Sequence, residues 1–132
     1  MEMVALITDP TKDPEPACIA LQIGMYLLMS PGGAAPADDV TLCVQTSGVE
    51  LINPDNNIHT RANPKPACAT PNGVKTASLQ GLLNGFESMC GKVVICTLCT
   101  MSRGITQLTN GIFANPVIIH NLFLSADKVM TF

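Results

Sequence analysis

Three short segments of the chain are apolar almost without interruption. They are residues 3–8 (MVALIT), 40–44 (VTLCV) and 93–96 (VVIC). Segments of this kind are typical of strands that are buried on both faces of a parallel sheet. Parallel strands in turn need crossover connections, which are usually helices. The three segments therefore predict an α/β fold in which helices cover the sheet.

Helical signals lie between and after these segments. Asp13 is expected to cap a helix that has Pro14 at its first position and runs to about Met29. Near the C-terminus, residues 115–116 (Asn-Pro) repeat the pattern of a cap followed by proline, and residues 129–132 are expected to form a last strand.

Two more helices are expected in the middle of the chain. Residues 47–50 have the capping-box spacing, with Ser47 as the cap of a short helix. Residues 77–90 have apolar side chains at helical spacing, and Gly91 is the expected C-terminal cap. Strands that alternate with helices predict a three-layer α/β/α domain with a mostly parallel sheet of about five strands, flavodoxin-like in general architecture.

A length of 132 residues fits one domain, so residues 1–132 are expected to form a single domain. Residues 54–75 are rich in proline and asparagine without a sustained apolar period, which predicts a long loop.

The longest apolar run, residues 17–29, is shorter than the ~20 residues that cross a bilayer, so no membrane span is expected. The N-terminal residues lack the basic segment of a signal peptide, which favours a cytoplasmic location.

The chain has few charged residues, and acidic residues slightly outnumber basic ones. With 7 basic and 10 acidic residues the formal net charge is −3, which disfavours nucleic-acid binding. Only 13% of the residues are charged while 47% are hydrophobic, and so few charges cannot coat an isolated globule. A homo-oligomer is therefore expected, with a subunit contact around residues 113–123.

The strand at residues 93–96 ends in the segment that carries most of the chemistry. If the chain turns helical there and Gly104 stops the helix, Cys96, Cys99 and Arg103 fall on one helix face. The N–H groups of a helix N-terminus and a nearby cation both favour a thiolate over a thiol. The sequence therefore predicts a reactive C-x-x-C pair in which the pKa of a cysteine is lowered.

The other cysteines and the nearby histidine are assigned to packing. Cys18, Cys43 and Cys90 lie on predicted apolar faces, where free cysteine packs well. His120 is expected to be a packing or interface residue. No second C-x-x-C occurs, and the dinucleotide-binding and P-loop motifs are missing, so neither a metal nor a cofactor is expected.

The order of these motifs resembles the DsrE/DsrF-like sulfur-relay family. The resemblance is carried by the VVIC strand that ends in Cys96, by residues 102–105 (SRGI) and by the closing residues 125–132 (SADKVMTF), and it covers most of the chain outside residues 54–75. It implies a small α/β/α domain that forms homotrimers or homohexamers. It also implies a persulfide on the cysteine at the position that Cys96 occupies.

The resulting expectation is a sulfur-handling protein, a possible sulfurtransferase, whose partners are sulfur donor and acceptor proteins or small sulfane-sulfur compounds. Cys96 would carry the persulfide, Arg103 would stabilise the anion, and Cys99 would tune or resolve the intermediate. Cys99 departs from the simplest relay pattern, because its attack on the persulfide would expel sulfide and leave a disulfide. A C-x-x-C thiol/disulfide oxidoreductase and a non-catalytic assembly subunit therefore remain alternatives, and the sequence leaves open which of the two cysteines is the nucleophile.

Overall fold

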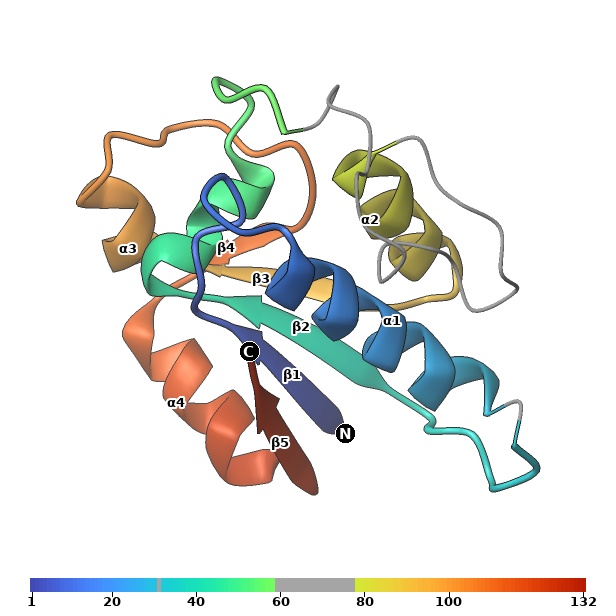
Figure 1. The fold of residues 1–132 in the computed structure, drawn as a ribbon. Coiled ribbons are helices and arrows are strands. Elements are labelled where there is room, and N and C mark those ends of the chain that lie inside the picture. Colours follow the sequence, from blue (N-terminus) through green and yellow to red (C-terminus); the bar gives the residue numbers. More distant parts are fainter. Residues whose placement is uncertain (31, 59–77) are drawn as a thin grey trace.

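The computed structural model describes residues 1–30, 32–58 and 78–132, and its centre is a five-stranded parallel sheet (Figure 1). The strand order is β4-β3-β2-β1-β5, and every neighbouring pair is parallel. The strands are β1 (Glu2–Leu6), β2 (Val40–Val44), β3 (Lys92–Cys96), β4 (Ile112–Ala114) and β5 (Lys128–Thr131). The predicted α/β class and the parallel sheet are confirmed.

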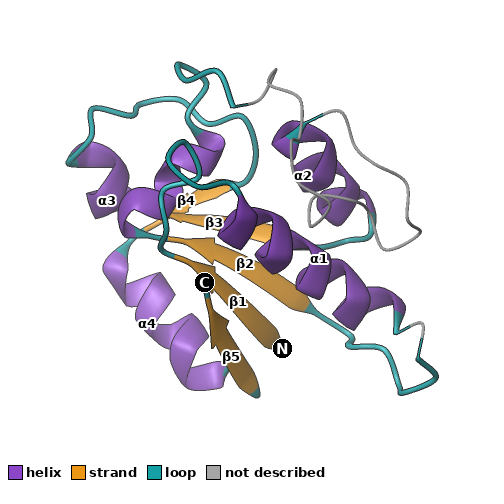
Figure 2. Cartoon of the chain, in the orientation of Figure 1, coloured by secondary structure: helices purple, strands orange, loops and turns teal. Residues whose placement is uncertain are grey.

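Helices cover both faces of the sheet, but unequally (Figure 2). On one face, α1 (Glu15–Met29) and α2 (Leu79–Ser88) enclose the larger part of the hydrophobic core. On the other face α4 (Pro116–Ser125) packs over a much smaller cluster and buries Ile119. The thinly covered face is also the one toward which Cys96 points, since this residue belongs to the smaller cluster.

Two short helices follow the carboxyl ends of the central strands. The 3-10 helix η1 (Thr46–Ile52) leaves β2, and α3 (Thr97–Met101) leaves β3. The predicted helical turn after the VVIC strand is thus confirmed, and Gly104 follows it in a left-handed conformation with φ of 66°. Within the described ranges, no helix is both long and apolar enough to traverse a bilayer.

The start of α1 differs from its prediction by one residue. Pro14 is the N-cap of the helix rather than its first residue, and no side chain caps it. The Asp13 carboxylate instead accepts a hydrogen bond from the Glu15 N–H at 3.1 Å, two residues ahead, as in an Asx-turn. This turn precedes the helix, which therefore begins one position later than the sequence indicated.

The predicted caps of the two middle helices are also wrong. Gln45 rather than Ser47 is the N-cap of η1, and its side chain makes no capping hydrogen bond. At the end of α2 the left-handed residue is Cys90, with φ of 69°, and not Gly91. Gly91 is needed for a different reason, because a Cβ there would lie 2.4 Å from the Phe86 ring.

The sequence did not locate β4, which is the edge strand of the sheet. Its three residues pair with the end of β3 in the register of Cys96 opposite Ala114. The Thr97 hydroxyl donates to the Ala114 carbonyl oxygen at 3.0 Å and secures the start of α3 against this strand. Of the predicted loop at 54–75, residues 54–58 are described, and the rest lies outside the described residues.

Candidate functional site: a thiol pair at the end of β3

The candidate site lies where β2 and β3 end, at the carboxyl edge of the sheet. Ligands and reactive groups of open parallel sheets gather at this edge, because the loops there diverge from the strand ends. Cys96 is the last residue of β3 and also the N-cap of α3, with extended φ and ψ of −63° and 113°. Cys99 lies one helical turn further along, so α3 brings its side chain back over the strand end.

The two sulfur atoms are in direct contact. The Cys99 thiol donates a hydrogen bond to the Cys96 Sγ, and the sulfurs are 2.8 Å apart. Both residues are free thiols, and a disulfide would bring the sulfurs to about 2.05 Å. Cys96 is 9% exposed, whereas Cys99 is only partly buried. The predicted proximity of the two cysteines is therefore present, with Cys99 nearer to solvent.

Arg103 reaches the site from the turn that follows α3. Its Nη1 donates to the carbonyl oxygen of Cys99 at 3.1 Å, and its Nη2 donates to the Ser47 Oγ at 3.3 Å. The guanidinium thus lies beside the thiol pair as predicted, and its hydrogen bonds hold the surrounding backbone. Ser47, which the sequence assigned to a helix cap, is the residue that anchors it.

The pKa of Cys99 is raised above the usual value of a cysteine thiol, opposite to the predicted direction. Burial is the main cause, because it disfavours the charged thiolate, and the hydrogen bond to Cys96 adds to it. A hydrogen bond from the Thr46 backbone and the positive charge of Arg103 act the other way and favour the thiolate. The sequence indicated the positive charge of Arg103, but it could not indicate how far the fold excludes water from the Cys99 sulfur.

The backbone at Thr46 is held in place by two further contacts. Thr46 has a left-handed φ of 47°, and its hydroxyl donates to the Ile7 carbonyl oxygen at 2.9 Å. Two residues on, the backbone of Gly48 packs so closely on β1 that a Cβ would lie 2.2 Å from the Leu6 carbonyl oxygen. The start of η1 is therefore fixed to the end of β1 with its backbone directed at Cys99. Sequence reasoning missed Thr46, because its contribution comes from its backbone.

A third thiol lies behind the pair. Cys43 on β2 is fully buried in the same cluster as Cys96, and the Gln45 amide donates to its Sγ at 3.3 Å. Burial raises the pKa of Cys43 to about 11, so it stays protonated at neutral pH. The predicted packing role of Cys43 fits this environment. The sequence did not indicate that the Cys43 thiol lies close to the Cys96–Cys99 pair.

The packing predicted for the remaining cysteines is wrong in one case and incomplete in another. Cys90 is exposed at the end of α2, because the left-handed turn there directs it away from the core. Cys18 is fully buried on α1 and is disulfide-bonded, so packing alone does not account for it.

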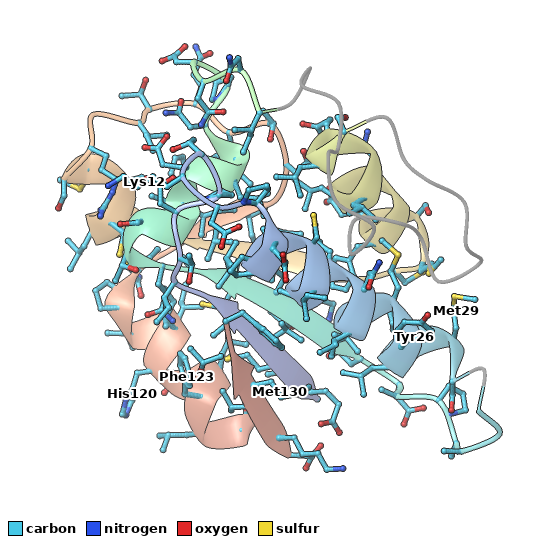
Figure 3. All side chains as sticks on the ribbon, in the orientation of Figure 1. Lys12, Tyr26, Met29, His120, Phe123 and Met130 are labelled. Carbon is cyan, nitrogen blue, oxygen red and sulfur yellow. The ribbon has the colours of Figure 1, made fainter. Side chains whose placement is uncertain are left out.

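His120 lies on α4, points away from the sheet and is exposed (Figure 3). Among the residues that the structure describes, no three His, Cys, Asp or Glu side chains are grouped to hold a metal ion.

One comparison with known proteins is informative. The fold is similar to the crystal structure of the YchN protein from E. coli, with a TM-score of 0.69 and 21% sequence identity over 100% of this chain and 99% of that one. No protein-family model matches the sequence, and no curated protein matches it either. At this level of identity the likeness shows a shared fold and does not extend to the activity.

Proposed function

We propose that this protein handles sulfane sulfur and carries it as a persulfide on Cys96. The observation that supports this most directly is the contact of the Cys96 and Cys99 sulfurs at the carboxyl end of β3, with Arg103 beside them. The proposal also rests on the motif resemblance to the sulfur-relay family, and it is compatible with the fold that the chain shares with YchN. Its partners would be sulfur donor and acceptor proteins or small sulfane-sulfur compounds.

The environment of Cys96 suits a persulfide that must survive until it is passed on. Its side chain is almost completely buried and packs in a cluster with Met3, Val94, Ala114 and Ile119. Persulfides are lost when a thiol attacks them, so burial protects a persulfide on Cys96 from small thiols in solution and leaves Cys99 as the neighbouring thiol that can attack it. The neighbouring Arg103 charge would stabilise the anionic form of the bound sulfur.

The same geometry also supports a second function, that of a thiol/disulfide oxidoreductase. If one thiolate attacks the inner sulfur of a persulfide on the other cysteine, a Cys96–Cys99 disulfide forms and hydrosulfide leaves with the electron pair of the broken bond. The 2.8 Å contact places the two sulfurs within easy reach of this reaction. Without added sulfane sulfur, the pair would exchange with protein disulfides and lose two hydrogens in the process.

Intact-mass spectrometry after incubation with inorganic polysulfide distinguishes these functions. A persulfide carrier gains about 32 Da, an oxidoreductase loses about 2 Da, and an assembly subunit remains unchanged. The measurement is best made in a Cys90→Ser background, because the exposed Cys90 would take up sulfur without any specific site. The added Cys96→Ser/Cys99→Ser double variant is the matched control. Uptake that persists in this control would refute the proposed site.

A further inference from the structure

The two thiols of the pair differ in how a donor can reach them. Cys96 is 9% exposed and lies within the small cluster under α4, while Cys99 is partly exposed on α3. In this reaction the attacking thiolate, the transferred sulfur and the leaving sulfur of the donor lie on one line. The body of the donor must therefore find room directly in front of the attacking cysteine. A protein donor meets this requirement far more readily at Cys99 than at Cys96.

Cys99 is also contacted by two groups that favour an anionic sulfur and that partly offset the burial and the Cys96 hydrogen bond, which raise its pKa. The Thr46 backbone donates a hydrogen bond to its Sγ, and the Arg103 charge acts on the same sulfur. Both contacts are built into the fold, since Thr46 is tied to Ile7 and Arg103 is tied to Ser47. When Cys99 loses its proton at the moment of attack, these groups are already in place to stabilise the charge.

We propose that Cys99 is the thiol that takes sulfur from the donor, and that Cys96 receives this sulfur from Cys99. This inference rests on the proposed persulfide function and adds a direction to it. Sulfur enters at the accessible thiol and is stored at the buried one. Cys99 is thus a nucleophile of the reaction rather than a residue that only tunes or resolves a persulfide on Cys96.

Both steps balance without an external oxidant or reductant. In the first, Cys99 loses its proton and its thiolate attacks the terminal sulfur of a donor persulfide, the donor S–S bond breaks, and the donor leaves as a thiolate that takes up the proton Cys99 has lost. In the second, the Cys96 thiolate attacks the terminal sulfur on Cys99, and the electron pair of that S–S bond returns to the Cys99 Sγ. The proton lost by Cys96 balances the one that Cys99 regains, and the sulfane sulfur keeps its oxidation state.

The second step requires a small movement of Cys99. At 2.8 Å the resting sulfurs leave no space for a further sulfur atom between them. A persulfide on Cys99 must therefore turn outward about its side-chain torsions before its terminal sulfur can meet Cys96. Because Cys99 is only partly buried, this rotation does not require the core to open.

Peptide mapping over a time course of polysulfide treatment tests the order of the two steps in the Cys90→Ser background. We expect sulfur on Cys99 first and on Cys96 later. The Cys96→Ser variant should acquire sulfur on Cys99 at an unchanged rate, and the Cys99→Ser variant should acquire it on Cys96 at least about tenfold more slowly. An unchanged rate in Cys99→Ser, or no uptake in Cys96→Ser, would overturn the inference while leaving persulfide formation itself intact. If even the parent protein takes up no sulfur, the proposed function fails as well.

Alkylation of the reduced protein provides a readout that does not depend on sulfur uptake. Iodoacetamide should modify Cys99 before Cys96, and a bulkier maleimide should increase this preference. A Ser102→Ala variant, altered at an exposed residue of the same segment, is the matched control and should retain the order. If Cys96 is modified first in the folded protein, the assignment of Cys99 is wrong.

Discussion

Arg103 is joined to Ser47 across the site, with its Nη2 donating to the Ser47 Oγ at 3.3 Å. The two residues are far apart in the sequence, and their contact links the turn after α3 to η1. The same guanidinium donates to the Cys99 carbonyl oxygen, so one side chain positions both segments that surround the Cys99 sulfur. Arg103 therefore has a structural effect as well as an electrostatic one, and the two can be separated by substitution.

Arg103→Met should slow the reaction of Cys99 with polysulfide or iodoacetamide at pH 7 by about threefold to fivefold, because an exposed charge contributes at most ~1 kcal/mol. The pKa of Cys99 is already raised, and loss of the cation should raise it further, so the alkylation profile should shift to higher pH. The groups that face this sulfur are the Cys96 and Cys43 thiols, the Arg103 guanidinium and the Thr46 backbone.

Two matched variants separate charge from geometry. Arg103→Lys keeps the charge and should leave the pH profile nearly in place, while Ser47→Ala removes the anchor and retains the guanidinium. If Arg103→Met and the parent protein give the same pH profile, the cation does not act on Cys99.

Gly48→Ala should destabilise the fold and displace η1. The added Cβ would lie 2.2 Å from the Leu6 carbonyl oxygen, and neither backbone can move without disturbing the end of β1. We expect a loss of about 2 to 3 kcal/mol in the free energy of unfolding, measured by urea denaturation. Gly32→Ala is the control, because a Cβ there meets nothing within 4 Å, and it should change the stability by less than about 0.5 kcal/mol. If Gly48→Ala and Gly32→Ala change the free energy of unfolding equally, the close approach of Gly48 to the Leu6 carbonyl oxygen is contradicted.

Cys43 should make the stability of the protein fall at alkaline pH. Its pKa is raised to about 11 in the folded state, so between the ordinary thiol pKa and this value the unfolded chain releases a proton that the folded chain retains. The contribution of Cys43 to the free energy of unfolding is fully present below pH 9 and is lost as the pH rises from 9 to about 11. The loss amounts to roughly 2 kcal/mol.

The matched measurement is urea denaturation of the parent protein and of Cys43→Ala at several pH values. The alanine variant should be less stable at pH 7, since it leaves a cavity in the small cluster. It should lose less stability than the parent between pH 8 and pH 11, so the difference between the two proteins narrows. A constant difference over this range would show that Cys43 does not titrate as described.

The sequence predicted the central strands because they are buried on both faces and therefore lack any polar alternation. It did not reveal β4, since three residues at a sheet edge leave no periodic signal and Ile112 and Phe113 are exposed. At the site, the spacing of Cys96 and Cys99 was informative because one helical turn necessarily brings them together. The direction of the Cys99 pKa shift could not be read in the same way, because it depends on which atoms exclude water from the sulfur.

The surface of α4 carries more exposed apolar side chains than a free helix of a soluble monomer tolerates. Ile119 is the buried residue of this helix, whereas Val117, Ile118, Phe123 and Leu124 are exposed, and Leu124 reaches 73%. An apolar helix over a thinly covered sheet face is typical of a subunit contact. We propose that the chain forms a homotrimer or homohexamer through this surface.

Phe123→Glu should therefore lower the assembly state, because a carboxylate buried between subunits loses its hydration without gaining a partner. Asn121→Glu adds the same charge at an exposed polar position of the same helix and is the matched control. Light scattering at micromolar concentration should give a multiple of the 13.9 kDa chain for the parent and the control, and a smaller mass for Phe123→Glu. A parent protein near its monomer mass would contradict the proposed assembly. Equal masses for an assembled parent and Phe123→Glu would place the contact elsewhere.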